Sequence, residues 1–170
     1  MTDILINKTQ EVDVDIILSM ESNIENSQFI FPNSKKEHIC LIKDENIEHL
    51  ILKSKKNEII GFVILAGLKD KNRNIEFRRI VIKEKGKGFG RIAIKKLKEY
   101  SFEKLNCHRF WLDVLKTNER AKYLYLSEGF KIEGELRDCI LVKNKYEDLM
   151  IMSILENEYK NTTANTVYSK

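Results

Sequence analysis

The feature that most constrains the fold of this 170-residue chain is an apolar run before its midpoint. Between Ile59 and Leu65, every residue except Gly61 is hydrophobic. A strand with one face in water alternates apolar and polar side chains, so a run without alternation predicts a strand that is covered on both faces. Such a strand needs helices on either side of its sheet, and the sequence therefore predicts a layered α/β domain.

The segments around this run predict the other elements of the domain. Short apolar runs predict strands at about 4–6, 49–53, 75–82, 108–114, 130–142 and 146–155. Helical spacing predicts two helices before residue 49, the second with Ser34 and Glu37 as a capping box, and two more that begin near residues 88 and 118. The result is one α/β (α+β mixed sheet) domain over residues 1–160, with helices on both faces. The polar residues 161–170 predict a loose C-terminal tail.

Composition narrows the classes of protein that remain. No apolar run reaches the roughly 18–20 residues of a membrane-spanning helix, and Met1 to Lys8 lacks the layout of a signal peptide, so a cytoplasmic location is expected. Three scattered cysteines form no C-x-x-C pair, and neither a disulfide framework nor a metal site is expected. Residues 1–50 hold ten acidic residues against four lysines, whereas the remainder holds 26 basic and 16 acidic residues. A basic body suits nucleic acid or a phosphorylated cofactor, and charge does not separate the two.

A glycine-rich segment joins the strand at 75–82 to the helix that follows it. It consists of Lys85, Gly86, Lys87, Gly88, Phe89, Gly90 and Arg91. Glycines let a backbone approach a ligand closely, and the free N–H groups of a helix start bind a pyrophosphate. The segment is not a Walker loop, because no Gly-Lys-Ser/Thr follows a glycine after four intervening residues. It does not match the dinucleotide G-x-G-x-x-G pattern either, because no glycine stands at position 91 or 93. It therefore predicts a phosphate-binding loop, with a tight turn and solvated lysines as the alternative.

A second distinctive segment runs from Asn118 to Phe130. Asparagine is a preferred N-cap, and Ala121, Leu124 and Tyr125 share one face of the helix that it begins. Considered alone, Tyr125 fits a core aromatic residue better than a catalyst.

Together, the two segments resemble the signatures of the GNAT superfamily of N-acetyltransferases. The family's cofactor signature, Arg/Gln-x-x-Gly-x-Gly/Ala, is similar to Lys85-x-x-Gly88-x-Gly90, with lysine in the first position. Its later motif, Asn-x-x-Ala-x-x-Leu-Tyr-x-x-x-Gly-Phe, is matched at Asn118, Ala121, Leu124, Tyr125, Gly129 and Phe130. The resemblance covers about residues 58–159. It implies the GNAT-like acyl-CoA N-acyltransferase fold and acetyl-coenzyme A (acetyl-CoA) as cosubstrate.

The resemblance also implies roles for single residues. In GNAT proteins, the strand before the glycine loop splays from its neighbour, and its backbone binds the pantetheine arm. That stretch is matched by Ile80, Val81 and Ile82, the pyrophosphate loop by Lys85 to Arg91, and the start of the helix near the thiol by Asn118. Tyr125 matches the residue that protonates the departing thiolate, which is the role of a general acid.

The resemblance favours Glu76 as the general base, since its strand position is similar to that of an acid which many family members place near the amine. An amine must lose a proton before it attacks a thioester, so a base or a chain of waters is needed. Two arginines follow Glu76, and an ion pair with one of them is the alternative. His108 is a second candidate but is expected to be peripheral, and Asp113 stays undecided.

Within the superfamily, the chain is most similar to the branch that holds bacterial spermidine N-acetyltransferases and ribosomal-protein N-terminal acetyltransferases. The similar stretches are residues 100–102, 105–108 and 133–137. Glu76 matches a polyamine-contacting glutamate of the spermidine enzymes, but Lys35 and Lys36 stand where those enzymes have an acidic entrance. A polyamine, a protein N-terminus and an amino sugar or other small amine all stay open as substrates.

Two functions other than acetyl transfer are considered, and the assembly state of the protein is predicted. A regulatory module that binds acyl-CoA without catalysis stays open. A basic nucleic-acid-binding protein is disfavoured, because the sequence has no recognisable recognition helix or aromatic RNA-binding motif. The resemblance implies a homodimer, and the apolar residues between Met150 and Leu155 favour it, since a solvated edge rarely carries so many.

Overall fold

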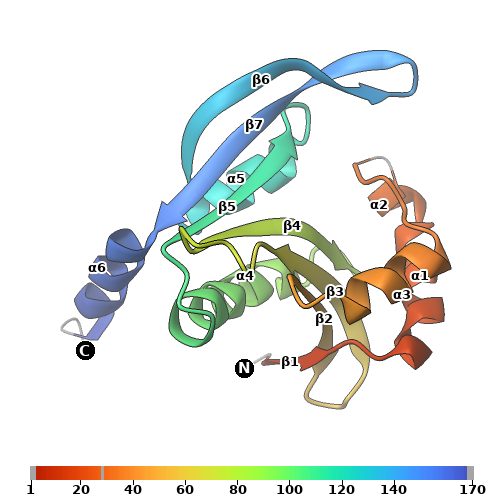
Figure 1. The fold of residues 1–170 in the computed structure, drawn as a ribbon, viewed down its shortest axis with the longest axis horizontal. Coiled ribbons are helices and arrows are strands. Elements are labelled where there is room, and N and C mark those ends of the chain that lie inside the picture. The colour runs from red at the N-terminus through yellow and green to blue at the C-terminus, as the bar shows by residue number, and fades with distance from the viewer. Residues whose placement is uncertain (1–2, 28, 168–170) are drawn as a thin grey trace.

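The computed structural model describes residues 3–27 and 29–167. Over these residues, a seven-stranded mixed sheet has the order β1-β2-β3-β4-β5-β7-β6 (Figure 1). Its strands are β1 Ile4–Lys8, β2 Ile47–Ser54, β3 Ile59–Ala66, β4 Asn74–Ile82, β5 Arg109–Leu115, β6 Lys131–Val142 and β7 Lys145–Leu155. Strands β4 and β5 are parallel, and the other neighbouring pairs are antiparallel. The predicted mixed α/β sheet is confirmed.

Helices cover both faces of this sheet, as predicted. A 3₁₀ turn (Glu11–Asp13), α1 (Val14–Glu21), α2 (Ile24–Ser27) and α3 (Lys35–Lys43) belong to one face. On the other face lie α4 (Phe89–Glu99), which continues into a π-helical turn (Tyr100–Lys104), and α5 (Glu119–Ser127). Each face has its own cluster of buried side chains: Ile17 of α1 packs in one, and Leu97 of α4 in the other.

Strand β3 is covered on both faces, as its apolar run predicts. All of its residues after Ile59 are buried. Phe62 and Ile64 pack in the cluster under α1, whereas Val63 and Leu65 pack in the cluster under α4. The run is apolar throughout because successive side chains of a strand point to opposite faces, and here both faces are covered.

The predicted capping box at the start of α3 is present. The Ser34 hydroxyl accepts a hydrogen bond from the Glu37 amide (3.3 Å), and the Glu37 carboxylate accepts one from the Ser34 amide (2.6 Å). These two bonds satisfy amides that a helix start leaves without partners. They fix the residue at which the preceding loop ends and α3 begins.

Strands β4 and β5 separate soon after they begin. They pair only at Asn74–Arg109, Ile75–Phe110 and Glu76–Trp111. Beyond Glu76, β4 keeps its partner β3 on one side and has no ladder partner among the described residues on the other. The splayed strands that the resemblance implied are therefore present.

The C-terminal part departs from the sequence prediction. Strands β6 and β7 form a hairpin that projects from the sheet (Figure 1). A helix, α6 (Glu156–Val167), then replaces the loose tail predicted from residue 161. It is anchored because the ring of Tyr159 stacks on Phe102 at 4.7 Å. Residues 168–170 of the predicted tail lie outside the described residues, and α2, whose four residues are too few to show a helical period, was not predicted.

Candidate active site

A pocket of about 620 Å³ opens at the glycine loop, where β4 ends and α4 begins. It is bounded by the end of β4, the loop, the first turn of α4, and α5. Nine of the eleven residues predicted to bind the cofactor line it: Ile80, Ile82, Lys85, Gly86, Gly88, Phe89, Gly90, Arg91 and Asn118. The two distinctive segments of the sequence therefore meet in one pocket.

Two of the predicted cofactor residues do not line this pocket. Val81 is 1% exposed and packs in the cluster under α1, because alternate residues of β4 point to opposite faces. Lys87 forms an ion pair with Glu84 instead of facing the pocket. The cations that line the pocket are Lys85, Arg91 and Arg120, and Arg120 was not predicted from the sequence.

The glycines give the loop its shape. Gly86 and Gly88 have φ of +79° and +78°, which is the left-handed region that side chains disfavour. Gly88 is the N-cap of α4 and provides no side-chain cap, so the amides of the first turn stay available. A Cβ at either glycine would meet nothing within 4 Å, so it would project into the space at the loop.

Some of the charged side chains around the pocket already form ion pairs within the protein. Burial, followed by the charge of Arg120, lowers the pKa of Lys85. Arg91 lines the pocket, but its guanidinium donates to the Glu128 carboxylate at 2.6 Å. Glu128 is 5% exposed at the end of α5. Arg91 therefore ties α4 to α5, and Lys85 is the better-placed cation for a phosphate.

A second pocket of about 230 Å³ adjoins the first. Its lining includes the loop residues Phe29, Ile30 and Phe31 together with Arg79 and Asp113. The two pockets share a set of lining residues: Phe29, Ile80, Asn118, Ala121 and Tyr125. The smaller pocket, called the acceptor pocket below, therefore meets the glycine-loop pocket beside Tyr125.

Tyr125 is held at this junction by its ring. The ring packs edge-to-face on Phe77 (6.0 Å between centroids) and on Phe130 (5.6 Å). Among the described residues, none hydrogen-bonds to its hydroxyl. Burial and the charge of Asp113 raise the pKa of Tyr125 above its usual value, so the phenol keeps its proton at neutral pH.

The acidic candidates differ in their surroundings. Glu76 is engaged by Arg78, whose Nε and Nη2 both donate to Oε2 of the carboxylate at 3.0 and 2.7 Å. The ion pair considered as an alternative therefore exists. Among the described residues, none bonds to Oε1, and Glu76 lines neither of the two pockets. Asp113 lines the acceptor pocket, and burial and the charge of Glu76 raise its pKa. His108 lies 3.4 Å from Glu156 and lines neither of these two pockets.

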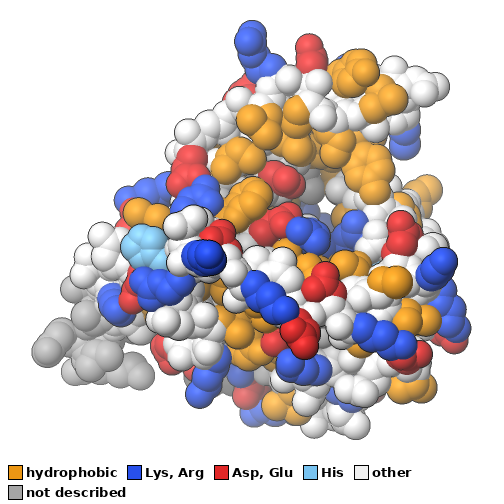
Figure 2. Space-filling model, in the orientation of Figure 1, with side chains coloured by type: hydrophobic (Ala, Val, Ile, Leu, Met, Phe, Trp, Pro, Cys, Tyr) orange, Lys and Arg blue, Asp and Glu red, His pale blue; other side chains and the backbone are white. Residues whose placement is uncertain are grey.

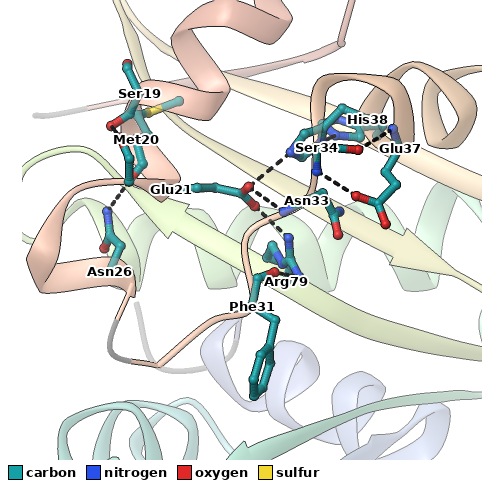
Figure 3. A network of polar contacts seen from close by, with 12 residues as sticks. Ser19, Met20, Glu21, Asn26, Phe31, Asn33, Ser34, Glu37, His38 and Arg79 are labelled. Carbon is teal, nitrogen blue, oxygen red and sulfur yellow. Dashed lines mark hydrogen bonds and ion pairs between the residues drawn. The ribbon is translucent and has the colours of Figure 1, made fainter. Parts of the chain in front are cut away.

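A buried polar chain beside the acceptor pocket was not predicted from the sequence, and Figure 3 shows three of its members, Glu21, His38 and Arg79. The Glu21 carboxylate contacts Arg79 Nη1 at 2.6 Å and His38 Nε2 at 3.1 Å. His38 Nδ1 lies 3.0 Å from Nε2 of His49, whose Nδ1 lies 2.9 Å from the Thr9 hydroxyl. No motif marks these five residues, because they come from five separate parts of the chain and meet only in the fold.

Comparison with known proteins identifies the family. A model of the acetyltransferase (GNAT) family matches residues 19–130. The chain is 34% identical over 121 residues to a spermidine N(1)-acetyltransferase of Vibrio cholerae serotype O1, which covers 71% of this chain and 70% of that protein. It is 25% identical over 137 residues to a spermine/spermidine N(1)-acetyltransferase of Bacillus subtilis, covering 76% of this chain and 85% of that protein. The chain belongs to the acetyltransferase (GNAT) family.

Solved structures agree with this assignment. The spermidine N-acetyltransferase from Vibrio cholerae in complex with CoA and spermine has a TM-score of 0.85 and 28% identity, over 94% of this chain and 99% of that one. The chain is therefore an acetyl-CoA-dependent acetyltransferase, and the spermidine side of the predicted branch is confirmed. In the part of the chain that the structure describes, no helix is long and apolar enough to cross a membrane. The same residues contain no cluster of three side chains suited to a metal ion.

Proposed function

We propose that this enzyme acetylates a primary amine by direct transfer, with acetyl-CoA in the glycine-loop pocket and the amine in the acceptor pocket. The observation that carries the proposal is that the two pockets share Tyr125 and Asn118. Direct attack needs the two reactants in contact, and a shared wall brings them together. The residues present fit the cofactor: left-handed glycines at Gly86 and Gly88, a free helix start and a strand edge without a partner.

The proposed chemistry assigns one task to each group. Acetyl-CoA supplies the acetyl group as a thioester. Glu76 accepts a proton from the amine through water, by the carboxylate oxygen that Arg78 leaves free, since Glu76 does not itself line the acceptor pocket. Backbone amides on the unpaired edge of β4 stabilise the oxyanion of the tetrahedral intermediate. Tyr125 then donates its proton to the departing sulfur.

We infer a cationic amine of the polyamine class as the preferred acceptor. Asp113 supplies a carboxylate in the acceptor pocket. The carboxylate of Glu76 is close enough for its charge to raise the pKa of Asp113. Lys35 and Lys36, which the sequence places where a polycation would enter, oppose its binding less than expected. Lys35 pairs with Asp15 at 2.7 Å, and neither Lys35 nor Lys36 lines the acceptor pocket. The relatives named for spermidine support the same class.

The test is turnover against a panel of amines: spermidine, glucosamine and a short peptide with a free N-terminal amine. We expect acetyl transfer to all accepted amines to depend on acetyl-CoA, with the highest kcat/KM for spermidine. A preference for the peptide or for glucosamine would overturn the polyamine assignment and leave the transfer chemistry in place. Binding of acetyl-CoA without turnover of any amine would instead support a regulatory module.

We also infer a homodimer that forms through the C-terminal hairpin. The stretch from Met150 to Leu155 is no solvated edge, because β7 lies between β5 and β6 and Met152 and Ile154 are buried. The inference rests instead on other apolar side chains of the hairpin, which are 47–60% exposed: Ile132, Leu136, Leu141 and Tyr146. Figure 2 shows hydrophobic side chains gathered over this hairpin, beside a hollow that carries charged groups. An apolar hairpin that projects from the sheet favours burial against a second copy. The cytoplasmic location expected from the sequence stays a prediction.

A further inference from the structure

The loop that walls the acceptor pocket is tied to the sheet by one buried carboxylate. Glu21, at the end of α1, has a side chain only 1% exposed. Its Oε1 accepts from Arg79 (2.6 Å), and its Oε2 accepts from the Asn33 amide (3.0 Å) and lies 3.1 Å from His38. A buried carboxylate is stable only when several donors compensate for its lost hydration. Burial opposes its ionisation, but His38, Arg79 and the Asn33 amide outweigh burial, so the pKa of Glu21 is lowered.

Arg79 carries the connection onward to the pocket wall. Its Nη2 donates to the carbonyl oxygen of Phe31 at 2.7 Å, while Nη1 binds Glu21 (Figure 3). One planar guanidinium therefore joins β4, α1 and the loop, a geometry that a lysine ammonium cannot reproduce. Both Arg79 and Phe31 line the acceptor pocket. Asn33, two residues after Phe31, is held by the same carboxylate.

The pair also affects the charge of the pocket, whose lining includes Arg78 and Asp113 besides Arg79. Arg79 has a side chain 14% exposed in the pocket that we assign to a cationic amine. A guanidinium without a counter-charge would repel that amine. The ion pair with Glu21 cancels the charge, so Glu21 acts on a pocket that it does not itself line.

We propose that Glu21 and Arg79 are positioning residues for the acceptor, which hold the loop at Phe31 and Asn33 as a wall of the acceptor pocket and keep that wall electrically neutral. The proposal rests on the proposed function. It assigns to this pair a part in amine binding and none in the binding of acetyl-CoA, since the pair contacts the loop at Phe31 and Asn33, and neither the pair nor these two residues line the glycine-loop pocket.

The experiment compares Arg79→Met, Glu21→Gln and the double variant with the wild type. Asp15→Asn is the matched control, because it removes another carboxylate of α1 whose ion pair with Lys35 is exposed. Two readouts are followed: hydrogen exchange of the Asn33 amide, and steady-state kinetics with the panel amine that gives the highest kcat/KM.

In Arg79→Met, we expect the acceptor KM to rise at least about tenfold, while the KM for acetyl-CoA stays within about twofold. In Glu21→Gln, the Asn33 amide should exchange faster, and the increase in acceptor KM should grow with the charge of the amine, because Arg79 is then unpaired. The control should match the wild type in both readouts.

The double variant separates positioning from plain stability. It carries no unpaired buried guanidinium, so its melting temperature should recover relative to Glu21→Gln. Its acceptor KM should stay raised, because the tether to Phe31 is still absent. Recovery of the acceptor KM together with stability, or equal increases in both KM values, would overturn the proposal. Failure of the proposed function would show differently, as absence of turnover by the wild type.

Discussion

At the scale of single residues, the phenol of Tyr125 is the group whose removal is most informative. Its ring packs on Phe77 and Phe130, but none of the described residues hydrogen-bonds to its hydroxyl. The hydroxyl can therefore be removed without loss of packing, because the ring makes the packing contacts and the hydroxyl lies at the junction of the two pockets.

We predict that Tyr125→Phe lowers kcat by at least about tenfold, since a positioned general acid contributes 10²–10⁴-fold and water substitutes in part. The KM for acetyl-CoA and the melting temperature should barely change. Tyr159→Phe is the matched control, because Tyr159 lies on the distant α6 and its hydroxyl donates to Glu103 at 2.8 Å. The control should lose stability and keep kcat. Wild-type kcat in Tyr125→Phe would reduce Tyr125 to a packing role.

His49 gives the protein a predictable dependence of stability on pH. Burial, followed by the charge of His38, lowers the pKa of His49 to about 4 in the folded protein, against about 6.5 for an unfolded histidine. Between these values only the unfolded chain binds the proton, so stability is full above pH ~6.5 and falls as the pH drops toward 4. Glu21 and Arg79 also act on this ring, the first raising and the second lowering its pKa.

We therefore predict a loss of about 3 kcal/mol of unfolding free energy from His49 between pH ~7 and ~4. His49→Gln should remove much of this slope in urea unfolding measured across that range. His108→Gln, which changes a histidine with a side chain 54% exposed, is the control and should keep the slope. An unchanged slope in His49→Gln would mean that other groups cause the acid sensitivity.

At the scale of elements, the glycine loop and α4 form one unit. The loop turns through two left-handed glycines into a helix start without a side-chain cap. A side chain at Gly88 costs backbone strain of roughly 1–2 kcal/mol and projects into the space where the pyrophosphate is proposed to bind.

We predict that Gly88→Val weakens the affinity for acetyl-CoA at least about tenfold, or ~1.4 kcal/mol. The control is Gly134→Val on β6, where a Cβ also meets nothing within 4 Å but the backbone does not have a positive φ. Calorimetry should show wild-type affinity for this control. An unchanged affinity in Gly88→Val would remove the loop from the binding site.

At the scale of the whole molecule, the hairpin of β6 and β7 is the part that most needs a partner. It projects from the sheet and carries exposed apolar side chains on both strands (Figure 1, Figure 2). Nothing else in the described chain covers Leu136 or Tyr146, which stay 47% and 60% exposed.

We predict that light scattering reports a particle of about twice the 20.0 kDa chain mass at micromolar concentration. Leu136→Lys together with Leu141→Lys should shift the protein toward the monomer, because charges placed in an apolar interface lose their hydration. Tyr123→Lys, which also replaces an exposed ring but lies on α5, is the control and should leave the dimer intact. A 20.0 kDa particle for the wild type would refute the dimer.

Local chemistry explains why so much of this protein was predictable from its sequence. The apolar run of β3, the capping box at Ser34 and the Asn118 cap of α5 each depend on neighbours a few residues away, and the structure contains all three. The same holds for most residues that line the glycine-loop pocket, because the glycine loop and the start of α5 are contiguous motifs. The side chains of Val81 and Lys87 lie outside this pocket, because a motif does not specify which way each side chain points.

What only the tertiary structure decided lies between segments that are distant in sequence. The junction at Tyr125 exists because α5 reaches the gap where β4 and β5 separate. The chain from Glu21 to His49 needs α1, α3, β2 and β4 together, and the sequence contains only isolated acids and histidines. The helix that replaced the predicted tail is stabilised by Tyr159 on Phe102. Such contacts depend on side chains that folding brings together, so no local sequence pattern predicts them.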